Sequence, residues 1–125
     1  FWNTLSAPGG VAKARQMYDD AKRAGKPAVL FPENETNLLG YQLLQEGNAK
    51  EAVEVFKLNV DAYPASANTY DSLSDAYLAL GNKAEALRYA EQAIAMLAKD
   101  AEASDNLKTL VRESAEKKIL ALKKP

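Results

Sequence analysis

Two short segments near the C-terminus contain residue types that could form an acyl-enzyme. Ser114-Ala115-Glu116-Lys117 fits S-x-x-K, and Ser104-Asp105-Asn106 fits S-D-N, two motifs that supply a nucleophile and its polar neighbours in serine enzymes. Here S-D-N precedes S-x-x-K, and both fall on one expected helix. The third motif of such sites, K-T-G, is also missing, because Lys108-Thr109 is followed by leucine. We interpret both segments as chance matches.

A carboxylate pair and a glycosylation sequon are the other candidates for chemistry. Asp71 and Asp75 are four residues apart, so they share one side of a helix, where paired acids can transfer protons or hold a cation. A solvated helix face is the commoner reason for this spacing. Asn34-Glu35-Thr36 is formally a glycosylation acceptor, but Asn34 is better explained as the cap of a helix, as is Asn68 one repeat later.

The composition excludes enzyme mechanisms that depend on cysteine or histidine. The 125 residues contain no cysteine and no histidine, which excludes disulfides, thiolate nucleophiles, Cys/His zinc sites and histidine-based triads within this chain. Sixteen basic and seventeen acidic residues leave a net charge of −1, and no apolar run approaches the ~20 residues that span a bilayer. We therefore expect no catalytic residue, no metal, no cofactor, and neither a nucleic-acid nor a membrane partner.

An internal repeat predicts the helices that would position the two carboxylates. The segment Gly47-Asn48-Ala49-Lys50-Glu51-Ala52 recurs as Gly81-Asn82-Lys83-Ala84-Glu85-Ala86, an offset of 81 − 47 = 34 residues. A 34-residue period is typical of the tetratricopeptide repeat (TPR), whose unit is two antiparallel helices. These residues resemble that family, and the resemblance implies binding rather than catalysis.

The first unit follows the TPR consensus closely. Gly40 and Ala52 are small enough to let two helices approach, Gly47 can end the first helix in a left-handed conformation, and Pro64 can stop the second. The second unit is more degenerate, with Ser74 in the place of Gly40 and Ala90 in the place of Phe56. We expect Ser74 to loosen the helix contact slightly.

The expected fold is all-α, a TPR-like antiparallel helix-pair solenoid with an extra N-terminal helix and a C-terminal capping helix. Residues 1–10 are a lead-in or linker, whose Phe1, Trp2 and Leu5 are expected to dock on this domain or on a removed neighbour, with a ligand site as the less favoured alternative. Residues 11–33 hold a helix and an apolar connector, with residues 28–32 extended. The first repeat covers 34–64, with helices over 34–46 and 49–62, and the second covers 67–99, with helices over 67–80 and 83–97. One compact domain is completed by residues 101–122.

The last stretch is expected to be a single capping helix because no glycine interrupts it. Its apolar stripe would consist of Leu107, Leu110, Val111, Ala115, Ile119 and Leu122, and its other faces would carry Arg112, Glu113, Glu116, Lys117 and Lys118. A helix with one charged side keeps the open end of a solenoid soluble. Lys117, Lys118, Lys123 and Lys124 also suit the negative end of this helix.

In a TPR, the first helix of each unit lines the concave face at its second, fifth, ninth, twelfth and thirteenth places. Counted from Glu33 and Ala67, these places hold Asn34, Asn37, Tyr41, Leu44 and Gln45, then Asn68, Asp71, Asp75, Leu78 and Ala79. This groove is polar and mildly acidic, with Tyr41 as its one aromatic anchor. It predicts a neutral or basic peptide or protein partner and disfavours the carboxyl terminus of a chaperone, which Asp71 and Asp75 would repel.

The stretch from Gly9 to about Leu97 resembles a more specific group. The segments Asn37–Leu44, Phe56–Val60 and Asn68–Leu73 are similar to the C-terminal TPR region of bacterial beta-lactamase-like/penicillin-binding serine hydrolases. The resemblance implies an accessory module in the periplasm or outside the cell, without any of the family's catalytic residues. The chain opens on Phe1 rather than methionine, which indicates a processed chain or part of a longer one.

Several functions follow from these patterns. The leading one is a non-catalytic scaffold that binds protein or peptide, as an accessory C-terminal module of a larger hydrolase. One alternative is an intramolecular domain that stabilises or orients a serine-hydrolase catalytic domain. Another is a self-associating module that forms a homodimer or exchanges helices. An enzyme in its own right fits least, because the chain lacks a convincing nucleophile and base.

Overall fold

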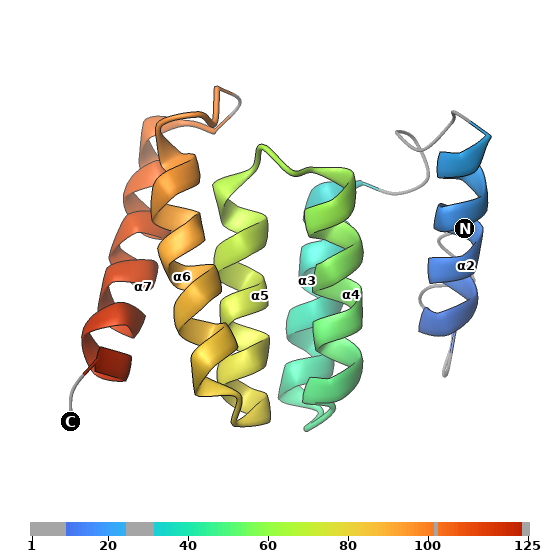
Figure 1. Ribbon diagram of the computed structural model, residues 1–125, viewed down its shortest axis with the longest axis horizontal. Helices are drawn as coiled ribbons and strands as arrows, with labels where there is room; N and C mark the ends of the chain where they lie inside the picture. The colour runs from blue at the N-terminus through green and yellow to red at the C-terminus, as the bar shows by residue number, and fades with distance from the viewer. Residues whose placement is uncertain (1–9, 25–31, 102, 124–125) are drawn as a thin grey trace.

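Helices joined by short connections make up the part of the chain that the structure, a computed structural model, describes: residues 10–24, 32–101 and 103–123. The helices are α2 (Val11–Arg23), α3 (Glu33–Gln45), α4 (Ala49–Ala62), α5 (Ala67–Leu80), α6 (Lys83–Leu97) and α7 (Asp105–Lys123), as Figure 1 shows. These residues contain no strand, which confirms the expected all-α class. The expected lead-in, apart from Gly10, and the extended connector, apart from Pro32, lie outside the described residues.

The repeated Gly-Asn pair joins two helices in each hairpin. Gly47 and Gly81 have φ angles of 79° and 89°, the left-handed conformation that glycine adopts at little cost. The next residues, Asn48 and Asn82, then accept hydrogen bonds from the third amides of α4 and α6. The predicted turns are thus confirmed.

The helices stack in chain order, with α5 at the centre. It packs against its sequence neighbours α4 and α6 and also contacts α3 and α7. In Figure 1, α4 lies in front of α3, and α6 lies in front of α5. Helices α3, α5 and α7 therefore form one layer, and α4 and α6 form the other.

Small residues let the two layers approach closely. A Cβ atom on Gly40 would lie 2.3 Å from the ring of Phe56, so that only glycine fits beside this fully buried aromatic. Ser74, at the equivalent place in the second repeat, is also fully buried, and its hydroxyl donates a 2.6 Å hydrogen bond to the carbonyl of Ala86 in α6. This hydrogen bond links the two helices, a contact that the expectation of a loosened packing at Ser74 did not include.

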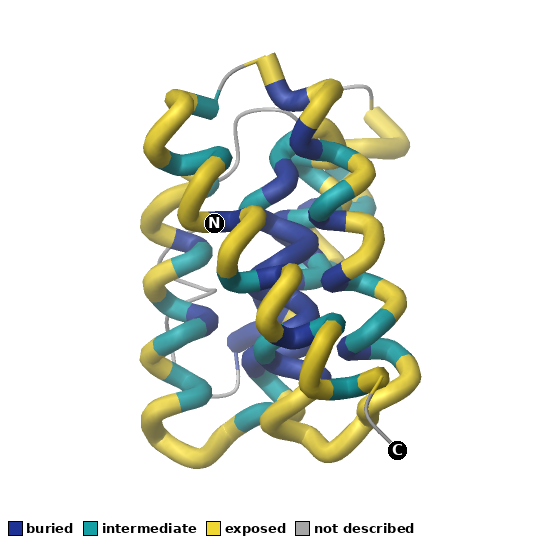
Figure 2. The backbone as a smooth tube through the Cα atoms, turned by 90° about the vertical axis from the view of Figure 1, so that its left-hand side faces the viewer, coloured by how far each residue is buried: buried dark blue, intermediate teal, exposed yellow. Residues whose placement is uncertain are grey.

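The core runs along the inside of the stack, as the buried segments in Figure 2 show. Phe56, Leu73 and Tyr77 belong to its central cluster, between the two repeats. Helix α2 closes one end, where Ala14 and Tyr18 pack with Val55 and Leu58 of α4 and with half-buried residues of α3.

Two expected helix caps are corrected. Helix α3 begins at Glu33, directly after Pro32, so Asn34 lies inside the first turn and does not cap it. Asn68 likewise lies inside α5. The first amide of α5, that of Ala67, instead donates to the Asp100 carboxylate at 3.1 Å. This cap comes from 33 residues downstream, which local spacing does not reveal.

Helix α7 also differs from the expectation. It begins at Asp105 rather than near residue 101. Leu110, expected on the apolar stripe, is 63% exposed, whereas Lys118, expected on a charged face, is only 7% exposed. The buried side of α7 is therefore rotated relative to the expected stripe. It is formed by Val111, Ala115 and Lys118, which follow the helical spacing of i, i+4 and i+7. Among the described residues, no helix combines the length and apolarity needed to cross a membrane.

Candidate partner-binding face

The first helices of the two repeats bring Tyr41 and Asp75 together. These residues occupy the same place in α3 and α5, 34 positions apart, and the Tyr41 hydroxyl donates to Asp75 Oδ2 at 2.6 Å. The same hydroxyl lies 3.3 Å from Ser72 Oγ, and the Tyr41 ring meets Phe56 edge-on with 5.2 Å between centroids. Tyr41 is thus fixed between the core and the predicted face.

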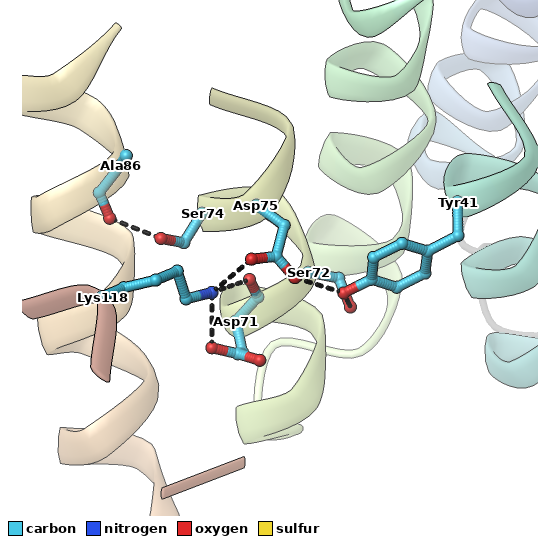
Figure 3. Close-up of polar contacts among 7 residues, drawn as sticks. All are labelled: Tyr41, Asp71, Ser72, Ser74, Asp75, Ala86 and Lys118. Carbon is cyan, nitrogen blue, oxygen red and sulfur yellow. Dashed lines mark hydrogen bonds and ion pairs between the residues drawn. The ribbon is translucent and has the colours of Figure 1, made fainter. Parts of the chain in front are cut away.

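A lysine from α7 joins the two predicted acids, as Figure 3 shows. Lys118 Nζ lies 2.7 Å from Asp71 Oδ1 and 2.9 Å from Asp75 Oδ1, and it donates to the backbone carbonyl of Asp71 at 2.8 Å. The side chains of Lys118 and Asp71 are 8% and 7% exposed, whereas that of Asp75 is 30% exposed. The structure therefore buries Asp71 and leaves Asp75 in partial contact with solvent.

The electrostatics of this group follow from its burial. Burial raises the pKa of Asp71, which the Lys118 ammonium partly opposes. Burial, followed by the Asp75 carboxylate, also raises the pKa of Tyr41. Tyr41 therefore remains a neutral donor near neutral pH. With both acids ionised, the formal charge of the group is −2 + 1 = −1.

The other predicted groove residues surround this group without joining its hydrogen bonds. Asn34, Gln45, Leu78 and Ala79 are exposed, and Asn37, Leu44 and Asn68 are half-buried. Leu44 packs against the central core cluster, and the buried Oδ1 of Asn37 has no hydrogen-bond partner. The face therefore combines exposed amides with small apolar patches. The binding role of these residues stays a prediction.

Sequence reasoning missed Lys118 as a member of the group. Its charge and its place near the C-terminus of a helix favoured a solvated position. The available signal was its spacing, because Lys118 lies three residues after Ala115 and four before Leu122, on the side of α7 that also carries Val111. A lysine on the buried side of a helix is almost always paired with an acid, and Asp71 and Asp75 were the available candidates.

In the two serine segments, the structure gives Ser104 a capping role and leaves Lys117 in solvent. Ser104 Oγ accepts a hydrogen bond from the backbone amide of Leu107 at 3.1 Å and so caps α7, and Lys117 is exposed.

Within the described residues, no group of three or more acidic, histidine or cysteine side chains is placed to hold a metal ion.

A hollow of about 670 Å³ lies at the loop end of the stack, away from the Tyr41 group. It is bounded by the start of α3, the connection between α4 and α5, residues 99–101, and Ala103. Burial raises the pKa of Glu33 on its wall, the hydrogen bond from Ser66 opposes this, and the nearby Asp100 adds to it. Ionised Glu33 is thus held in an unfavourable environment.

Comparison with known proteins does not assign this face. No protein-family model matches the chain, and neither a curated protein nor a solved structure matches it significantly.

Proposed function

We propose that this chain is a non-catalytic helical-repeat scaffold of the TPR type that binds a neutral or basic segment of another protein. The observation that carries the proposal is the contact between Tyr41 and Asp75. Equivalent positions of α3 and α5 meet on one face, as they do where tandem helix pairs form a continuous binding surface. The 34-residue period and the left-handed glycines at both hairpins support the same repeat type.

The charge of the face supports the chemistry of the partner. Lys118 balances one of the two carboxylates, and the remaining negative charge is next to the partly exposed Asp75. A partner with a lysine or arginine complements that charge, whereas an acidic terminus is repelled. Exposed amides of Asn34 and Gln45 can bind the backbone of an extended segment.

Selection from a displayed peptide library, followed by matched variants, tests the proposal. Gln45→Arg adds a positive charge to the face, and Gln92→Arg adds the same charge to an exposed position of α6, in the other layer. Selected peptides should be neutral or basic. They should bind Gln45→Arg at least about fivefold more weakly than the parent and bind Gln92→Arg like the parent. Equal binding to both variants, or selection of mainly acidic peptides, would contradict the proposal.

Leu38 favours a second candidate, packing of the repeats on a catalytic domain of a serine hydrolase or on another copy of the chain. Leu38 is 69% exposed, although it precedes Ser72 by one period, 38 + 34 = 72, and Ser72 is 1% exposed beside Tyr41 of α3. The position of α3 that corresponds to the covered Ser72 of α5 therefore carries an exposed leucine. Leu38→Lys should abolish such association in light scattering or co-purification while leaving the helix content unchanged.

A further inference from the structure

Two side chains of α7 occupy part of the proposed binding face. Lys118 places its ammonium between Asp71 and Asp75, the fifth and ninth places of α5. Leu122, four residues later and so on the same side of α7, packs against the core cluster that Leu44 also contacts. The chain thus presents to its own face a basic group, which is the chemistry proposed above for a partner, together with an apolar group.

The middle and the end of α7 are held differently. Near its middle, Val111 and Ala115 are 2% and 0% exposed within a core cluster of α5 and α6, and Ser104 caps the helix start. In its last two turns, the core-facing Ile119 and Leu122 are only partly buried. The final ion pair, Lys123 Nζ to Glu91 Oε2 at 3.5 Å, lies between side chains that are at least half exposed.

Helix ends open more easily than helix centres because their last carbonyls lack intrahelical partners. Exposed ion pairs such as that of Lys123 add little stability. The buried contact of Lys118 is therefore the main polar restraint on these turns. Opening them would release both carboxylates and uncover the part of the core cluster beneath Leu122.

We propose that residues 118–123 form a latch over the repeat face, and that a partner segment with a lysine or arginine and a leucine four residues apart displaces it. The inference rests on the proposed function, because latch and partner compete for the same carboxylates. The apparent affinity of the partner is then its intrinsic affinity multiplied by the fraction of molecules whose latch is open.

A comparison of the linked and unlinked forms of one variant tests the latch. The chain has no cysteine of its own, so Glu91→Cys and Lys123→Cys in the full chain create two exposed thiols. A short bismaleimide that joins them holds the last turns closed. The probe is a fluorescent synthetic peptide of residues 114–123, which carries Lys118 and Leu122, and its binding is followed by anisotropy.

The unlinked protein should bind this peptide, and cross-linking should weaken binding at least about tenfold. A peptide with Lys118→Met should bind the unlinked protein more weakly than the parent peptide does, whereas one with Leu120→Ser should bind like the parent, because Leu120 is exposed. Hydrogen exchange should show faster opening around Leu122 than around Val111, and the added peptide should speed that opening further.

Two results overturn the inference. Equal affinity before and after cross-linking means that the latch does not cover the binding site, and the proposed function then stands without it. Failure of the unlinked protein to bind the peptide means that the latch segment does not resemble a ligand. The library selection described above decides separately whether the face binds other segments.

Discussion

Replacing Lys118 with methionine removes the ammonium group from two carboxylates while keeping much of the side-chain volume. The side chains of Lys118 and Asp71 are 8% and 7% exposed, and breaking a buried pair by removing one partner costs about 3–5 kcal/mol. Asp75 is 30% exposed and retains part of its hydration. We therefore expect a loss at the lower end of that range, about 3 kcal/mol near neutral pH.

Urea unfolding followed by circular dichroism measures this loss. Lys117→Met is the matched control, because Lys117 is the exposed neighbour, and its free energy of unfolding should change by less than about 0.5 kcal/mol. Equal stability of the two variants would refute the reasoning, since it would mean that the buried lysine does not offset the carboxylates.

The pH dependence of the loss checks its cause. Burial already raises the pKa of Asp71 in the folded protein, and removing Lys118 raises it further. A carboxyl group whose pKa is raised on folding destabilises the fold when ionised, and this cost disappears as the pH falls through the folded pKa towards the unfolded one. The difference between the parent and Lys118→Met should therefore shrink on acidification. A constant difference down to about pH 4 would contradict the electrostatic explanation.

Three further substitutions test separate contacts. Gly40→Ala places a Cβ 2.3 Å from the Phe56 ring and should cost about 1–3 kcal/mol in urea unfolding, partly recovered when combined with Phe56→Leu; no cost would mean that the ring shifts freely. Ser74→Ala removes the 2.6 Å hydrogen bond to the Ala86 carbonyl and should cost about 1 kcal/mol, whereas a gain in stability would contradict its linking role. Because burial raises the pKa of Glu33, Glu33→Gln should stabilise the fold modestly near neutral pH and have no effect at about pH 3; melting curves that show the reverse order would disprove this.

The features of the fold that depend on neighbouring residues in the sequence were predictable. Gly47 and Gly81 end helices through their own backbone conformation, and the asparagine after each acts within the next three residues. Because the motif occurs twice, the sequence marks these helix ends in both repeats. The expected helix ends at both hairpins agree with the structure to within about one residue.

The parts that depend on distant residues were not predictable from spacing alone. Asp100 caps α5 from 33 residues downstream, and Lys118 reaches Asp75 across 43 residues. The expectation of an acidic groove was formed without the neutralising lysine, since the helix that carries it departs from the repeat pattern. For the candidate face, the period placed Tyr41 and Asp75 at the same place of successive helices, but it did not predict their hydrogen bond or the role of α7.

The polar chain from Tyr41 through Asp75 to Lys118 has a consequence for how the molecule folds. Substantial helix contacts in the described part of the chain join elements that are adjacent or one apart in sequence, an arrangement in which each pair can form nearly independently of distant ones. Asp75 is bonded to α3 through one carboxylate oxygen and to α7 through the other. Its hydrogen bonds are complete only when all three helices are in place, so this residue couples the assembly of the two repeats to the docking of the terminal helix.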